Sequence, residues 1–178
     1  MKSDVIMIDN CGNGFGNVVN ETRKVAAYQQ LTGKDVLHLE LITEEMLSLV
    51  RSITGEMQAA FWIETEDARY DLHLTTKTVM DKEKRYLLIS SASSRKNEAA
   101  KTFLGYLRNA FEEAMAADVS HADHGFPEDV LNDLPRYPVD DTEWDGYERS
   151  VLRKVADNVK IAIRGGVVDM TVSKRFAK

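Results

Sequence analysis

The sequence predicts a single α+β domain: a two-layer sandwich with helices on one face of a mixed β-sheet. Three observations support this. Two helical patterns follow a short apolar run near the N-terminus, alternating polar and apolar residues mark strands in the middle, and the chain ends in a hairpin pattern. With 178 residues, the chain has the length of one domain, so we treat residues 1–178 as one unit.

The first third of the chain predicts a strand followed by two helices. Residues 5–8 are apolar and end at Asp9, and Asn17 is expected to cap a helix that stops at Gly33. Asp35 is expected to cap the next helix, which Gly55 ends. Apolar residues recur along that helix at spacings of three and four, typical of a buried helical face: Leu39, Ile42, Met46, Leu49 and Ile53.

The middle of the chain predicts three strands and a helix. The strands are expected at residues 57–63, 70–75 and 86–89, and the second alternates polar with apolar residues, as a strand with one buried face does. His73 and Trp62 fall in these runs and are expected to be structural. A polar loop at residues 90–97 leads into a helix over residues 98–115.

The last third predicts an irregular connection, a helix and a hairpin. The connection, at about residues 117–143, is acidic and contains all three prolines. A helix is expected at residues 144–157, and the hairpin joins residues 159–163 to 167–172 through Gly165 and Gly166. The predicted order of elements is therefore β-α-α-β-β-β-α-α-β-β.

Composition excludes several classes of protein. A single cysteine excludes a disulfide scaffold, and 43% hydrophobic with 29% charged residues excludes a disordered chain. No apolar run approaches the ~20 residues of a membrane span, and polar residues rather than a signal-peptide core follow Met1. A net charge of −6 argues against nucleic-acid binding. We therefore expect a cytoplasmic protein that binds neither membrane nor nucleic acid.

Charge is segregated along the second half of the chain. Residues 112–148 contain twelve Asp and Glu with one basic residue, Arg136, whereas residues 149–178 contain eight Lys and Arg with two Asp. One interpretation is a solvated acidic loop that packs near the basic end. The other is a docking surface that selects a partner by charge.

Two short motifs resemble functional sites. Gly12, Gly14 and Gly16 lie between a strand and a helix, as in phosphate-binding loops, but no Gly-Lys-Ser/Thr follows and position 17 is not glycine. A flexible turn is the preferred interpretation. His121, Asp123 and His124 are metal-binding residue types, but no second cluster completes a coordination shell. A metal-dependent hydrolase built on them is the weakest of the functional hypotheses.

The predicted second helix contains Thr43-Glu44-Glu45-Met46-Leu47-Ser48-Leu49-Val50-Arg51. It resembles the N-box helix of the anti-sigma-factor kinases in the GHKL (histidine kinase-like ATPase) superfamily, and the order of elements extends the resemblance along nearly the whole chain. The resemblance implies the histidine kinase-like ATPase fold, with Glu45 at the position of the general base. The magnesium-binding Asn position is Leu49, which has no oxygen for a hard cation.

The glycine boxes of that family are also degenerate. No glycine occurs from Glu56 to Leu104, where the resemblance places the adenine-binding motif and the start of the ATP lid, and only Gly105 is similar to the second glycine box. Phosphoryl transfer depends on metal and backbone donors that position the phosphates. The resemblance therefore leaves Glu45 and Gly105 as vestiges of a cofactor site, with no metal ligand.

The leading hypothesis is a non-catalytic regulatory module that binds a protein partner. The resemblance implies a sigma factor or an anti-anti-sigma type regulator as that partner, and homodimerisation. The loss of the metal ligand and of the glycine boxes implies that no cofactor is bound. The alternative is an active ATP-dependent serine/threonine kinase with a divergent lid, in which Glu45 is the base, Gly105 lines the phosphate path and Mg-ATP is bound.

Overall fold

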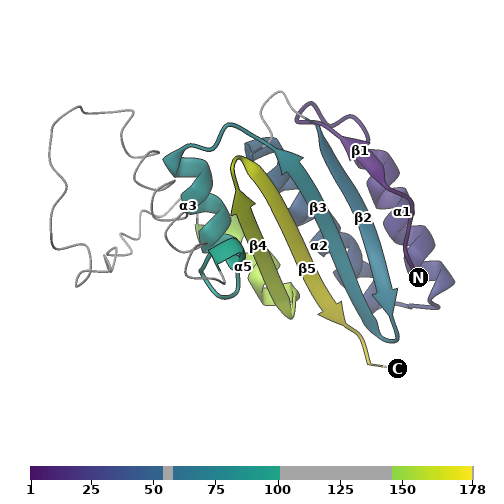
Figure 1. Ribbon diagram of the computed structural model, residues 1–178. Helices are drawn as coiled ribbons and strands as arrows, with labels where there is room; N and C mark the ends of the chain where they lie inside the picture. Colours follow the sequence, from purple (N-terminus) through teal and green to yellow (C-terminus); the bar gives the residue numbers. More distant parts are fainter. Residues whose placement is uncertain (54–57, 101–145, 178) are drawn as a thin grey trace, which may run out of the picture.

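The computed structural model describes residues 1–53, 58–100 and 146–177 (Figure 1). They form an α+β arrangement, a five-stranded open sheet with helices packed against it. In chain order the elements are β1 (Ile6–Ile8), α1 (Phe15–Tyr28), α2 (Lys34–Ile53), β2 (Ala59–Glu66), β3 (Arg69–Lys77), α3 (Lys82–Ser91), the 3₁₀ turn η1 (Glu98–Ala100), α5 (Gly146–Val155), β4 (Asn158–Arg164) and β5 (Val167–Arg175).

The sheet has the strand order β1-β2-β3-β5-β4, and all four neighbouring pairs are antiparallel. The prediction of a mixed sheet is therefore wrong for the described strands. The reason is local. Two-residue turns join β2 to β3 and β4 to β5, and such turns produce antiparallel pairs. The helical pair α1–α2 returns the chain to the end of the sheet that it left, so β2 also runs antiparallel to β1.

One face of the sheet forms the core with the helices, as the sequence predicted. Alternate residues of β2, β3, β4 and β5 are buried, while their neighbours point to the other face. Helices α1, α2 and α5 lie on the buried side, with α3 beside β4 (Figure 1). In the predicted stripe of α2, Leu39, Ile42 and Met46 are fully buried, and Leu49 is partly buried against the same core.

The strand predicted at residues 86–89 is wrong, because these residues belong to helix α3. The Asp81 carboxylate accepts a hydrogen bond from the backbone N–H of Lys84 (2.7 Å), which starts the helix as an N-cap. Leu88 is fully buried while Tyr86 is exposed. A four-residue apolar run does not distinguish a strand from one turn of a helix.

Two predicted helix caps also differ from the structure. Asn17 lies inside α1, whose N-cap is Gly14, and Asp35 lies in the first turn of α2. The helix predicted at 144–157 is found as α5, and the C-terminal hairpin is found as β4 and β5. Apart from η1, the helix predicted at 98–115 lies outside the described residues, and so does the acidic connection at 117–143. In the described segments, no helix is long and apolar enough to span a membrane.

Candidate functional site

The face of the sheet opposite the helices carries polar side chains in rows that cross the strands. Residues directly opposite each other in neighbouring strands share a face, so the register defines the rows. We name the three rows nearest the β2–β3 turn, each written from β2 toward β4. The aromatic row contains Trp62, His73, Thr171 and Lys160; the carboxylate row contains Glu64, Asp71, Ser173 and Asn158; and the end row contains Glu66, Arg69 and Arg175. Among the described helices, none lies over these strands on this side (Figure 1).

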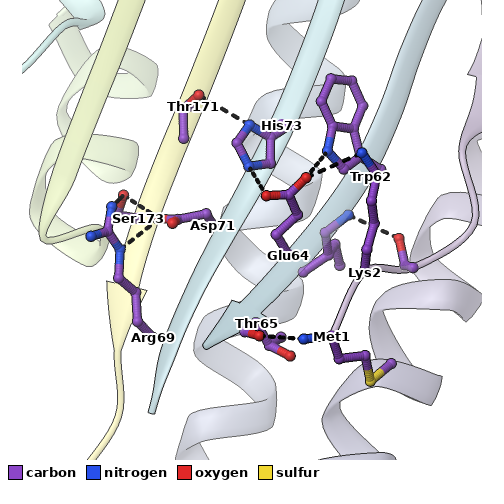
Figure 2. A network of polar contacts seen from close by, with 12 residues as sticks. Met1, Lys2, Trp62, Glu64, Thr65, Arg69, Asp71, His73, Thr171 and Ser173 are labelled. Carbon is purple, nitrogen blue, oxygen red and sulfur yellow. Dashed lines mark hydrogen bonds and ion pairs between the residues drawn. The ribbon is translucent and has the colours of Figure 1, made fainter. Parts of the chain in front are cut away.

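Trp62 is held in place on this face by three contacts. Its ring stacks on the His73 ring, with centroids 4.9 Å apart and planes 8° from parallel. The indole Nε1 donates to Glu64 Oε1 (3.0 Å), and Lys2 Nζ lies 4.8 Å from the ring centroid (Figure 2). A large, partly exposed aromatic side chain is thus fixed in one orientation before any ligand arrives.

The environment of His73 favours its neutral form. Its Nδ1 lies 3.2 Å from Thr171 Oγ1. Its Nε2 is buried and lies 3.7 Å from Glu64 Oε2, and it has no hydrogen-bond partner among the described residues. Burial lowers the pKa of His73 below its ordinary value of 6.5, and this outweighs the opposing attraction of the Glu64 carboxylate. The neutral ring stacks on Trp62 without carrying charge into the face.

Glu64 and Asp71 are directly opposite each other in the β2–β3 pair, an arrangement of like charges that needs compensation. Lys2, whose Nζ lies 3.1 Å from Glu64 Oε1, and then the Trp62 indole hold the pKa of Glu64 below its ordinary value. Asp71 accepts hydrogen bonds from Arg69 Nε (2.9 Å) and from the Ser173 hydroxyl (Figure 2). Each carboxylate is therefore neutralised by its own partners.

The glycine-rich turn between β1 and α1 organises itself around Asp9. The Asp9 carboxylate accepts hydrogen bonds from the backbone N–H groups of Cys11 (2.9 Å) and Asn13 (3.0 Å) and from Asn13 Nδ2 (2.6 Å). The Asn13 side chain is the main cause of a lowered pKa for Asp9. The backbone N–H groups that a bound phosphate would need therefore already donate to the Asp9 carboxylate. This supports the interpretation of the segment as a turn rather than a phosphate-binding loop.

The described residues include two of the positions that the family resemblance selected, Glu45 and Leu49, both on α2. Glu45 is half-buried on α2, in the helical layer, and Leu49 packs against the core. Gly105 lies outside the described residues, as do His121, Asp123 and His124. Within the described ranges, no three His, Cys, Asp or Glu residues lie together in a way that could hold a metal ion.

The functional candidates that sequence reasoning missed are the members of the three rows. The alternation in residues 70–75 predicted a polar face, and Trp62 and Glu64 alternate in the same way along β2. That alternation was the available signal. It did not show which residues of different strands lie side by side.

Comparison of the chain with protein-family models and with curated proteins finds no match.

Proposed function

We propose that the protein is a non-catalytic regulatory module that binds a partner protein across the open face of its sheet. The observation that carries this proposal is the fixed Trp62 on that face, held by His73, Glu64 and Lys2. Trp is among the residues that contribute most to protein interfaces, and a side chain that is already ordered loses little entropy on binding.

The chemistry of the face specifies the partner's surface. Trp62 offers a flat apolar centre, and cations of the aromatic and end rows, Lys160, Arg69 and Arg175, lie toward β4. A partner with an apolar centre and carboxylates on one side is complementary to this arrangement. The family resemblance adds the regulatory class, a sigma factor or an anti-anti-sigma type protein.

The absence of catalysis is supported by Leu49. In the resembled family this position carries the Asn that holds magnesium, whereas here a partly buried aliphatic side chain packs against the hydrophobic core. Restoring an oxygen ligand would place a polar group against apolar neighbours, which is unfavourable without a hydrogen-bond partner. The position serves stability in this chain.

Site-specific photo-crosslinking in cells of the native host tests the partner surface. A photoreactive amino acid at Thr75 or Thr171, both on the open face, is expected to yield one discrete adduct with a partner protein. The same amino acid at Lys24, exposed on α1, is the matched control and is expected to yield none. An adduct formed from Lys24 and not from the sheet positions would contradict the proposal.

The partner identified in this way is then purified and titrated against variants. Trp62→Ala is expected to weaken binding by about 30-fold, the effect of removing an interface hot spot. Thr75→Arg, which adds bulk and charge to the same face at a position outside the three rows, is expected to weaken binding as well. Tyr28→Ala, on the exposed side of α1, is the control and should bind like the parent protein. Unchanged affinity in both sheet variants would sink the proposal.

Isothermal titration with Mg-ATP tests the non-catalytic part. We expect no heat of binding and no ATP turnover in either the parent protein or Glu45→Gln. Micromolar, magnesium-dependent binding, together with turnover that Glu45→Gln abolishes, would establish the kinase alternative instead.

A further inference from the structure

One corner of the open face concentrates positive charge in a chain whose net charge is −6. Arg69 and Arg175 are directly opposite each other in the β3–β5 pair, on the same face of the sheet. Like charges in this position are destabilising unless something compensates them. The two arginines line a shallow hollow of about 240 Å³ together with Lys160, Lys174, Asp157, Asn158 and Ser173.

The ion pairs of the hollow leave part of this charge without compensation. Lys174 Nζ pairs with Asp157 Oδ1 (3.0 Å), and the backbone N–H of Arg175 donates to Asp157 Oδ2 (2.7 Å). Burial opposes ionisation of Asp157, but these contacts outweigh it and lower its pKa. The Arg69 guanidinium forms an ion pair with the Asp71 carboxylate. Within the described part of the chain, neither the Arg175 guanidinium nor the Lys160 ammonium forms an ion pair with a carboxylate.

The donors around the hollow suit an anion with several oxygens. The Arg69 guanidinium is oriented by Asp71 and by the Ser173 hydroxyl, which lies 3.2 Å from its terminal nitrogen, so it is held in place (Figure 2). Arg175 faces it across the strands, Lys160 adds a third cation, and Asn158 adds an amide. Guanidinium groups recognise phosphate through paired hydrogen bonds, and a phosphate dianion offers three acceptor oxygens.

We propose that this corner is a phosphate-binding site, with Arg69, Arg175 and Lys160 as its cations. A bound dianion reduces the repulsion between Arg69 and Arg175. It also pairs with the positive charge that Asp71 and Asp157 do not neutralise. The proposal does not depend on a protein partner. The phosphate group is either free or carried on a phosphorylated side chain, and the two sources share the same chemistry.

Titration of ¹⁵N-labelled protein with inorganic phosphate at low ionic strength, followed by NMR, tests the site. Saturable shifts are expected at Arg69, Lys160 and residues 173–175. The double variant Lys160→Gln/Arg175→Gln is expected to bind at least about tenfold more weakly, since each cation contributes a charged hydrogen bond. Both side chains are exposed, so the variant should keep the parent spectrum elsewhere. Arg164→Gln, an exposed cation at the other end of β4, is the matched control and should leave binding unchanged.

A phosphoserine peptide of otherwise neutral sequence distinguishes the two sources. If it binds more tightly than inorganic phosphate, while the unphosphorylated peptide does not bind, the site reads a modified side chain. If the peptide binds no more tightly, the free anion is the ligand. Shifts that never saturate, or that persist unchanged in the double variant, would overturn the proposal.

Discussion

Three glycines after the first strand look equivalent in the sequence but are not equivalent in the structure. Gly14 has φ +83°, and a Cβ there would lie 2.3 Å from the Met7 carbonyl oxygen, whereas a Cβ at Gly16 would meet nothing within 4 Å. The cluster predicted a turn. It could not show which glycine the turn requires, because the restriction comes from the backbone of a different element.

Substitution at the two positions is therefore expected to have opposite effects. Gly14→Ala should lower the free energy of unfolding by about 1–3 kcal/mol or more, because the backbone there would be strained and the new Cβ would clash with the Met7 carbonyl. Gly16→Ala, in the first turn of α1, should raise it by up to about 1 kcal/mol because alanine favours the helix. Urea unfolding of both variants measures the difference. Equal stability of the two would contradict the conformation described for Gly14.

The stack of Trp62 on His73 could likewise be predicted only in part from the sequence. The sequence predicted a strand for each residue, and the alternation in residues 70–75 predicted that the strand of His73 has one polar face. The contact itself depends on the register of β2 against β3, which the turn after Glu66 sets. Register is decided by turn geometry and by the buried residues on the opposite face, so the rows could not be derived from residue spacing alone.

Among elements, the outer edge of β4 is protected by the loop that follows α3. The Ser93 backbone N–H donates to the Val159 carbonyl (2.9 Å), and the Ser93 hydroxyl accepts from the Val159 N–H (2.8 Å). Asn97 does the same with one side chain, because its amide donates to the Ile163 carbonyl (3.0 Å) and accepts from the Ile163 N–H (2.9 Å). The loop thus replaces a sixth strand and covers an edge that would otherwise pair with other chains.

Asn97→Ala removes both hydrogen bonds to Ile163 and leaves backbone groups at a buried edge without these partners. We expect a loss of about 1–3 kcal/mol in the free energy of unfolding and more self-association. Urea unfolding and light scattering measure the two effects. Ser94→Ala, in the exposed part of the same loop, should stay within about 0.5 kcal/mol of the parent. Parent-like stability of Asn97→Ala would show that the edge does not need this cover.

The sequence predicted most elements correctly where a pattern was long. The 20-residue helix α2 and the nine-residue strand β3 were both expected, whereas the short run at residues 86–89 was assigned to the wrong type. Long patterns average over many residues, while a single turn is decided by one cap, here Asp81. Whether a sheet is mixed or antiparallel is a question of connection, and residue patterns within strands do not address it.

At the scale of the whole molecule, the two faces of the sheet have different roles. One face is closed by helices and holds the core, and the other holds a neutral histidine and carboxylates fixed by their own partners. Glu45 and Leu49, the described residues that the family resemblance selected, lie on α2 in the helical layer. The residues proposed to bind lie on the other face, where no apolar helical pattern exists to indicate them.

The position of His73 on the open face leads to a prediction about stability in acid. The pKa of His73 is lower in the folded protein than its ordinary value of 6.5, so below that pH the unfolded chain binds more protons. The free energy of unfolding should therefore fall as the pH drops below 6.5, by no more than about 1.4 kcal/mol per pH unit for one proton. The lowered pKa values of Glu64 and Asp157 act in a separate window, because their stabilisation is lost only as the pH falls below 4.5 and 3.8, their ordinary values.

Urea unfolding between pH 8 and pH 3 separates the two stages. His73→Gln, which stays neutral, is expected to remove the upper stage and leave the lower one. His38→Gln is the matched control, since His38 is exposed on α2 and its loss should leave both stages in place. If His73→Gln follows the parent curve between pH 7 and pH 5, then the buried Nε2 of His73 does not resist protonation. In that case the neutral stack on Trp62 would not be the state that a partner meets.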